Sequence, residues 1–226
     1  MCIRDRYSAI ARQGYTHVIV LMIAECLSSA NNLMRLAAEE HPELTVKVFD
    51  SKSASIGLGA LAVQVARYAV RGVAFDPLCE LTKRLIDDTV VYFSLDTLEY
   101  LQRGGRIGRA TALAGGLLQI KPILTFDRKD GMISTAAKVR GRRGVQQRLI
   151  ELATELAAKH PGEEYNLVVC DGNVPEEGAA LEAALTRALP NAHRVLHGKI
   201  DATLAVHLGP NLLGVGVQFL NSKLPA

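Results

Sequence analysis

One histidine stands at the end of an apolar run, shortly before a Gly-Pro pair that turns the chain. The segment is AVHLGPNLLGVGV, from Ala205 to Val217, and the histidine is His207. Its imidazole fits two descriptions: a core side chain that satisfies its own hydrogen bonds, or the polar tip of an otherwise apolar pocket. No histidine at metal-pair spacing accompanies it, and neither a Gly-x-Ser-x-Gly elbow nor a Ser-His-Asp order is present. The sequence therefore supports neither a metal site nor a hydrolytic triad.

Hydroxyl side chains follow the first two apolar runs of the chain, in AECLSSANN and in DSKSAS. In open α/β sheets, ligands bind beyond the carboxyl ends of the strands, where the free N–H groups of a helix N-terminus suit a carboxylate or a phosphate. Plain N-capping explains the same serines without any ligand. Ser28 and Ser29, in the first segment, therefore fit either role.

Two arginine-rich segments have the chemistry to hold an anion. LEYLQRGGRIGRA brings Arg103, Arg106 and Arg109 together around glycines, and arginine forks bind phosphate or carboxylate in bidentate fashion. The spacing is that of neither a G-x-x-x-x-G-K-[ST] loop nor a G-x-G-x-x-G loop, and cations that complement a helix C-terminus are the alternative. KVRGRRGVQQR, from Lys138 to Arg148, collects five basic residues and no acid, which points to an acidic partner protein or a phosphate.

Continuous β-branched runs alternate with helical patterns in the first part of the chain. Strands are expected over residues 16–23, 44–50 and 89–93, and helices from Ser28 or Ser29 onward, over 51–72 and over 77–87. Alternation of this kind predicts a parallel sheet covered by helices on both faces. We therefore expect an N-terminal parallel α/β/α sheet domain over residues 7–93.

The second part of the chain combines a hairpin with further strand and helix patterns. Asp130-Gly131 between two β-like runs predicts the hairpin. Helices are expected over residues 143–159 and 175–189, and strands over 165–172, 192–200 and 203–209. These elements predict a two-layer mixed-sheet α/β domain over residues 94–226, with the boundary near Ser94. The expected fold class is thus α/β, with two domains.

The composition is that of an ordinary globular chain, with 226 residues, 49% hydrophobic and 22% charged. No apolar run reaches the ~20 residues that a membrane span needs. The net charge of +3 and the aromatic content of 5% give little support to a nucleic-acid partner. Four scattered cysteines argue against a disulfide framework and a zinc site, and they indicate the cytoplasm. The first six residues, MCIRDR, resemble a translated sequencing adapter, so we expect the natural N-terminus to be missing.

Several segments occur in the order and spacing of the DegV family of bacterial lipid-binding proteins. They are FDSKSASIGLGALAVQVARYAVRG, SLDTLEYLQRGGRIGRATALAGGLLQIKPILTFD, KVRGRR and HLGPNLLGVGV, and the likeness runs from about Thr16 to Val217. The resemblance implies two α/β domains with a long-chain fatty acid held between them. In some members a separate kinase phosphorylates the carboxylate of the bound acid. The resemblance therefore implies a carrier and not an enzyme, with no catalytic residue, cofactor or metal of its own.

The resemblance also implies which residues hold the ligand. They are His207, Ser28, Ser29, Arg103, Arg106 and Gly209. His207 of HLGP corresponds to the family's histidine beside the fatty-acid carboxylate, and Ser28 corresponds to a serine of its SS-x-LSGT loop. Arg103 and Arg106 take a secondary role, at the domain junction or at the phosphate of an acyl phosphate.

Other segments receive expectations from the same resemblance. ATALAGGLLQI and NLLGVGV are expected to form walls of the acyl tunnel, and the basic run from Lys138 to Arg148 is expected to dock the kinase. In the SS-x-LSGT loop the chain departs from the family, because Ala24 and Glu25 stand where the family has two serines.

Two alternatives belong to different functional classes. The fold also resembles the substrate domain of dihydroxyacetone kinase, so the chain could be an enzyme or a substrate subunit acting on a small phosphorylated compound. The arginine clusters could instead serve a nucleic-acid-binding regulator. The sequence contains no recognisable nucleotide loop or metal-binding carboxylate cluster, which favours the lipid carrier over the enzyme.

Overall fold

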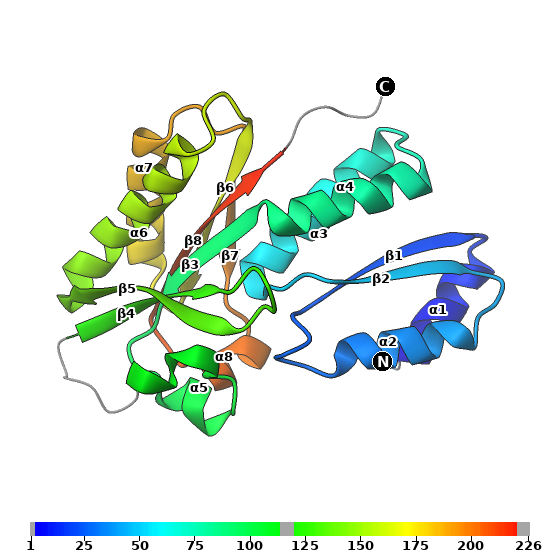
Figure 1. Cartoon of the computed structure of the whole chain (residues 1–226), viewed down its shortest axis with the longest axis horizontal. Coiled ribbons are helices and arrows are strands. Elements are labelled where there is room, and N and C mark those ends of the chain that lie inside the picture. The colour runs from blue at the N-terminus through cyan, green and yellow to red at the C-terminus, as the bar shows by residue number, and fades with distance from the viewer. Residues whose placement is uncertain (1–2, 114–119, 221–226) are drawn as a thin grey trace.

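The chain folds around two β-sheets of unequal size, and the computed structural model describes residues 3–113 and 120–220 (Figure 1). The strands are β1 (His17–Met22), β2 (Thr45–Asp50), β3 (Thr89–Ser94), β4 (Ile120–Phe126), β5 (Ile133–Arg140), β6 (Tyr165–Gly172), β7 (Arg194–Lys199) and β8 (Leu212–Phe219). The helices are α1 (Ile3–Arg12), α2 (Ala30–Glu39), α3 (Ser55–Val70), α4 (Phe75–Asp87), α5 (Glu99–Arg103), the 3₁₀ helix η1 (Gly108–Leu113), α6 (Gly141–Ala158), α7 (Pro175–Ala188) and α8 (Ala202–Leu208).

The smaller sheet pairs β1 with β2 in parallel and is covered by helices on both faces. Because side chains alternate along a strand, Val18 and Val20 of β1 pack with α1 and α2, while Ile19 and Leu21 pack with α3 and α4. The expected α/β/α layering of this part is therefore present. Helix α1, which no sequence pattern predicted, completes one of its layers with a fully buried Tyr7.

The larger sheet has the strand order β5-β4-β3-β8-β6-β7. β6 runs parallel to β7, and the other neighbours are antiparallel. Every residue of β6 and of β8 is buried, as continuous apolar runs in a central strand predict. The predicted hairpin joins β4 to β5, with Gly131 at φ +72. The expected fold class, α/β with a parallel sheet and a mixed sheet, is confirmed.

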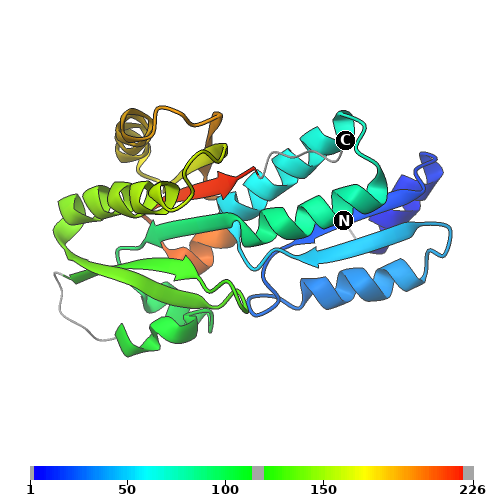
Figure 2. The ribbon, with the colours of Figure 1, turned by 45° about the horizontal axis from the view of Figure 1, so that its top comes forward.

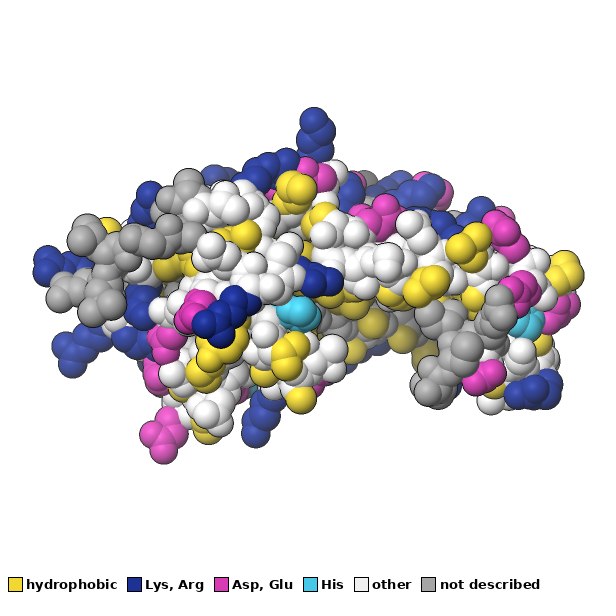
Figure 3. Space-filling view, turned by 90° about the horizontal axis from the view of Figure 1, so that it is seen from below, with side chains coloured by type: hydrophobic (Ala, Val, Ile, Leu, Met, Phe, Trp, Pro, Cys, Tyr) yellow, Lys and Arg dark blue, Asp and Glu magenta, His cyan; other side chains and the backbone are white. Residues whose placement is uncertain are grey.

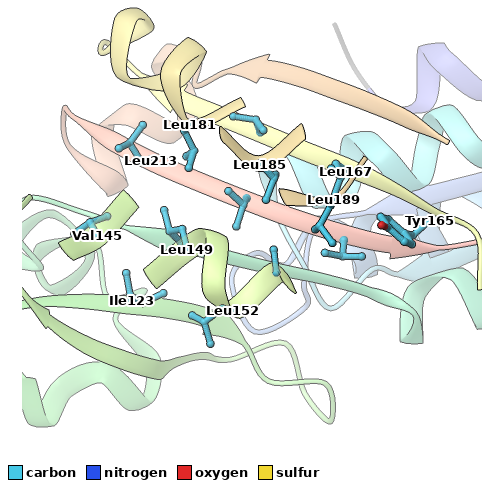
Figure 4. Close-up of a cluster of buried hydrophobic side chains, with 14 of the residues drawn as sticks. Ile123, Val145, Leu149, Leu152, Tyr165, Leu167, Leu181, Leu185, Leu189 and Leu213 are labelled. Carbon is cyan, nitrogen blue, oxygen red and sulfur yellow. The ribbon is translucent and has the colours of Figure 1, made fainter. Parts of the chain in front are cut away.

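Helices α6 and α7 cover one face of the larger sheet and enclose its main core (Figures 2 and 4). Leu149 of α6 and Leu185 of α7 are fully buried against Leu213 and Val217 of β8. A fully buried leucine contributes about 1.5–3 kcal/mol relative to an exposed one, so this layer holds the sheet firmly. The opposite face carries α5 and α8, and it is the face that forms the site.

Helix α3 joins the two sheets, because it contacts β1 on the smaller and β3, β6 and β8 on the larger. Its Gln64 is buried and accepts a hydrogen bond of 3.3 Å from Nδ2 of Asn166, and the same amide donates to Gln218 on β8 at 3.0 Å. Tyr68 of α3 also donates to the carbonyl of Leu220, at 3.1 Å. Buried polar groups need hydrogen-bond partners, so these bonds fix the position of α3 along the strands of the larger sheet. Helix α3 thereby sets the spacing between the two sheets.

Strand β3 corrects one detail of the predicted organisation. The sequence pattern placed Thr89–Phe93 in the parallel N-terminal sheet, whereas β3 pairs antiparallel with β4 and β8 in the larger sheet. The local sequence shows only that a strand forms there; its partner is decided by β8, which follows it by more than a hundred residues and inserts between β3 and β6. The boundary near Ser94 stays a prediction.

Residues 202–208 correct a second detail. The apolar run 203–209 was expected to be a strand, but Ala202–Leu208 forms α8. Asp201 explains the change, because its side chain accepts a hydrogen bond from the backbone N–H of Leu204 and so caps the helix. The strand of this region is β8, which begins only after Gly209-Pro210.

A histidine outside the site, His197 on β7, ties β7 to its neighbours. Nε2 lies 3.1 Å from the buried carboxylate of Asp171 on β6, and Nδ1 bonds Glu182 on α7. Burial alone lowers the pKa of His197, but the hydrogen bonds to Glu182 and Asp171 outweigh it and raise this pKa above its ordinary value.

Candidate functional site

A cavity of about 290 Å³ lies between the larger sheet and the loops that follow β1 and β2, with α5 and α8 over it. Figure 3 shows hydrophobic side chains gathered in the recess between the two ends of the molecule on this side. The apolar walls include Leu27, Ile56, Phe93, Phe126, Leu204 and Leu212. The polar lining residues are Ser28, Ser55, Arg106, Thr203 and His207. The cavity is therefore suited to a largely apolar ligand with one polar end.

Helix α8 positions His207 over the cavity. Thr203, Leu204, His207 and Leu208 line the cavity, and their spacing of one, four and five residues places them on one face of a helix. Val206, on the other face, is 66% exposed. The helix thus presents the imidazole to the cavity in a way that the expected strand would not have done.

The imidazole of His207 offers one nitrogen to a ligand. Nδ1 is buried and has no hydrogen-bond partner within residues 3–113 and 120–220. It is pressed against Gly104, where an added Cβ would lie only 2.6 Å from Nδ1. Nε2 makes no hydrogen bond to the described residues either, and it is not among the atoms sealed from solvent. Nε2 is therefore the atom with which His207 can donate to a bound acid.

The two hydroxyl-rich loops reach the cavity through one serine each. Ser28 lines it and also accepts a hydrogen bond of 3.3 Å from the backbone N–H of Ala30. Ser29 does not line it: this residue is the exposed N-cap of α2. Ser55, which the sequence pattern does not distinguish from its neighbouring serines, lines the cavity at the start of α3 and has a positive φ of 53°. The signal for it was present in DSKSAS, but a run of three serines does not show which of them faces inward.

Of the two arginines predicted to have a secondary role, only one lies at the cavity. Arg106 lines the cavity, and its guanidinium donates to the carbonyls of Leu27, at 3.3 Å, and of Gly104. Arg103 does not line it: the side chain is 77% exposed and pairs with Glu99 one turn earlier on α5. The expectation that both arginines meet at the site is wrong for Arg103, because α5 ends at this residue and the chain turns at Gly104-Gly105 before it reaches Arg106.

Gly209 has a conformational role and does not line the main cavity. It ends α8 with a φ of +71°, and an added Cβ would lie 2.5 Å from the ring of Tyr100. Only glycine combines this left-handed backbone with so close a ring. Gly209 therefore fixes where α8 stops, and through it the placement of His207.

Several other charged residues of the prediction find partners inside the chain. Glu25 pairs with Arg35 at 2.5 Å and is not among the residues that line the cavity. In the basic run, Arg142 pairs with Glu177 at 2.7 Å, and Arg148 pairs with Glu151 and Glu155. The interpretation that no acid neutralises this run is therefore wrong for Arg142 and Arg148, whose acidic partners lie on α7 and on later turns of α6.

Cys170 on β6 forms part of the apolar wall. Burial, followed by the nearby charge of Asp171, raises the pKa of its thiol to about 12. The thiol therefore stays neutral at physiological pH and acts as a small apolar side chain.

Two further expectations concern walls and metals. Of the expected wall NLLGVGV, Leu212 lines the cavity, whereas residues 114–119 of ATALAGGLLQI lie outside the described residues. Throughout the described ranges, no cluster of three or more His, Cys, Asp or Glu side chains is arranged to hold a metal ion. In the same ranges, none of the helices combines the length and apolarity needed to cross a membrane.

The fold and the cavity together define a two-sheet α/β protein with an internal apolar ligand site. The chain belongs to the DegV family, whose sequence profile, described as an uncharacterised protein family, matches residues 2–220. A DegV domain-containing protein of Clostridium acetobutylicum is 34% identical over 210 residues, which make up 92% of this chain and 73% of the relative.

Solved structures show the same fold. A fatty-acid-binding DegV family protein of Thermus thermophilus matches with a TM-score of 0.88 and 29% identity, over 96% of this chain and 76% of that one. DegV of Bacillus subtilis, described as a fatty acid binding protein, matches with a TM-score of 0.84 and 28% identity, over 96% of this chain and 77% of that one.

Proposed function

We propose that this chain binds a long-chain fatty acid in the cavity, with the acyl chain against the apolar walls and the carboxylate at His207. The observation that carries the proposal is the cavity itself: its walls are largely apolar, and only a few polar side chains line it. The fatty-acid-binding relatives support the same ligand class.

The walls supply most of the affinity. Each methylene group that leaves water contributes about 0.8 kcal/mol, so an acyl chain of ordinary length gains far more from the cavity than its head group does. A small phosphorylated substrate, as in the kinase-like alternative, would gain nothing from these walls. The cavity therefore favours the lipid over the alternative.

The polar residues stabilise the head group. A buried carboxylate is costly unless hydrogen bonds replace its water, so several donors have to meet it. Nε2 of His207 and the hydroxyls of Ser28 and Ser55 are suitable donors, and the guanidinium of Arg106 adds positive charge nearby. Ser29, Arg103 and Gly209, placed elsewhere, are not needed for these contacts.

The finer role we propose is that of a carrier in the cytoplasm, which presents the acid to a separate fatty acid kinase and does not catalyse a reaction itself. The free thiols of Cys26, Cys79 and Cys170 agree with a reducing compartment such as the cytoplasm. Since Arg142 and Arg148 are occupied internally, the docking role of the basic run rests on its exposed members, such as Lys138 and Arg143.

Binding of palmitic acid to the delipidated chain tests the proposal. We expect palmitic acid to bind, its methyl ester to bind more weakly, and His207→Ala to weaken the acid at least tenfold, the loss expected for one hydrogen bond to a charged group. Val206→Ala, one residue away on the exposed face of α8, is the matched control and should leave affinity unchanged. Equal binding of acid and ester by the wild type and by His207→Ala would contradict the role of His207, and no binding at all would contradict the function.

A further inference from the structure

A second, much smaller chamber adjoins the main cavity and shares two of its walls. This chamber has a volume of about 20 Å³ and is lined by Val91 and Phe126, which also line the main cavity. Its other walls are largely polar and include Lys52, Ser53, Asp87 and Arg128. Val91 and Phe126 therefore form a partition between an apolar space and a polar one.

Neighbouring groups hold Val91 in place. Thr125 on β4 donates a hydrogen bond of 2.8 Å to the carbonyl of Val91. Gly57 of α3 lies so near that an added Cβ would be 2.8 Å from a Val91 methyl group, and a Cβ added at Gly216 of β8 would lie 3.4 Å from the same methyl group. Phe126 packs its ring against Phe93, with ring centroids 5.4 Å apart. The partition is thus built from close contacts to strands and to a helix.

The partition lies at the end of the cavity away from His207. Val91 pairs with Gly216 on β8, whereas Leu212, which begins β8 just after α8, lines the cavity four residues earlier. Four residues of strand correspond to ~13 Å. An acid whose carboxylate lies at His207 therefore extends its methyl end along β8 toward the partition.

We infer that Val91 and Phe126 close the methyl end of the acyl site and so limit the length of the fatty acid that this chain accepts. The inference rests on the proposed function. Ser53 strengthens this limit on acyl length, because its hydroxyl lines the smaller chamber, is buried and has no hydrogen-bond partner among the described residues. The chamber behind the partition holds about one water molecule, and a methyl group entering it would displace polar solvation and contact polar groups.

The test measures the affinity of saturated fatty acids of twelve to twenty carbons for the full chain and for Phe126→Ala. The wild type should show an optimum length, beyond which affinity falls. In Phe126→Ala the optimum should move to acids about two carbons longer. Each newly buried methylene group raises the affinity about fourfold, so the first acid beyond the wild-type optimum should bind roughly tenfold more tightly. Phe75→Ala is the control, because the ring of Phe75 packs at a tilt against His17, outside both chambers.

The outcomes separate the two proposals. If the wild type binds none of the acids, the proposed function fails. If the wild type binds them and Phe126→Ala keeps the same optimum, the partition does not set the length and the inference is overturned. If Phe126→Ala does not fold, Phe126→Leu decides in the same way, with a smaller shift toward longer acids expected because the leucine side chain keeps part of the wall.

Discussion

Replacing Gly104 by alanine puts a methyl group where the ring of His207 now lies. The added Cβ would be 2.6 Å from Nδ1, and the ring has to move by roughly 0.8 Å to regain an ordinary contact of 3.4 Å. The backbone tolerates the change, because Gly104 has φ −76 and ψ −7, a right-handed conformation that alanine adopts freely. The next nearest group, the carbonyl oxygen of Tyr100, would lie 3.2 Å from the added Cβ, so Gly104→Ala is mainly a steric perturbation of one imidazole.

The expected loss equals the hydrogen bond that the displaced imidazole no longer makes. A hydrogen bond to a charged group contributes about 1.5–3 kcal/mol, which corresponds to roughly 10- to 100-fold in affinity for a fatty acid. The stability of the chain should change little, since an alanine at a compatible glycine position adds about 0.4–1 kcal/mol and offsets the local crowding. Weaker binding without a loss of stability is thus the signature of this variant.

A double-mutant cycle provides the assay. Palmitic acid is titrated into the wild type, Gly104→Ala, His207→Ala and the double variant, and urea unfolding is followed for all four. Because both single changes act through the same imidazole, Gly104→Ala should cost little further affinity once His207 is alanine. Gly59→Ala, on a part of α3 where an added Cβ meets nothing within 4 Å, is the matched control.

Two results would refute this reasoning. Full affinity in Gly104→Ala would mean that the position of the ring does not matter to the ligand. Equal losses from Gly104→Ala in the presence and absence of the imidazole would mean that the added methyl group acts on the loop or on Arg106 and not on His207.

Three other properties of the chain are open to direct test. Gly209→Ala should lower the free energy of unfolding by about 1–3 kcal/mol in a urea titration, because it forces an alanine to a φ of +71° against the ring of Tyr100. His197 has a raised pKa in the folded chain, so its stabilising effect is fully present below its unfolded pKa of about 6.5 and is lost as pH rises through the folded value. The difference in the free energy of unfolding between wild type and His197→Gln should therefore shrink as pH rises above about 6.5. The thiols of Cys26 and Cys170 should differ in reactivity: exposed Cys26 should react first with a thiol reagent at neutral pH, whereas Cys170, with a pKa of about 12, should react only on unfolding. Mass spectrometry of the labelled peptides measures both.

Elements with a strong local pattern were predictable from the sequence. The apolar run of β6 and the hairpin at Asp130-Gly131 are examples, since each is decided by neighbouring residues. The run at residues 203–209 was not, because a short apolar stretch fits a strand and a buried helix equally well. Asp201 was the available signal, as an N-cap residue directly before the run.

The site was predictable only in part, for a physical reason. His207 and Ser28 could be proposed from the resemblance, and both line the cavity. Ser55 and Phe126 could not be singled out, because they reach the cavity through the packing of α3 and β4 against β3, which no local pattern encodes. The expectation for Arg103 was wrong because α5 ends at this residue and a turn at Gly104-Gly105 separates it from Arg106, which alone of the two lines the cavity.

The most direct test of the account is a crystal structure of the chain with palmitic acid. We expect an acyl chain inside the cavity, with its carboxylate within about 3.2 Å of Nε2 of His207 and its methyl end against Phe126. An acid bound outside the cavity, or one bound in the reverse direction with its carboxylate at Phe126, would contradict it.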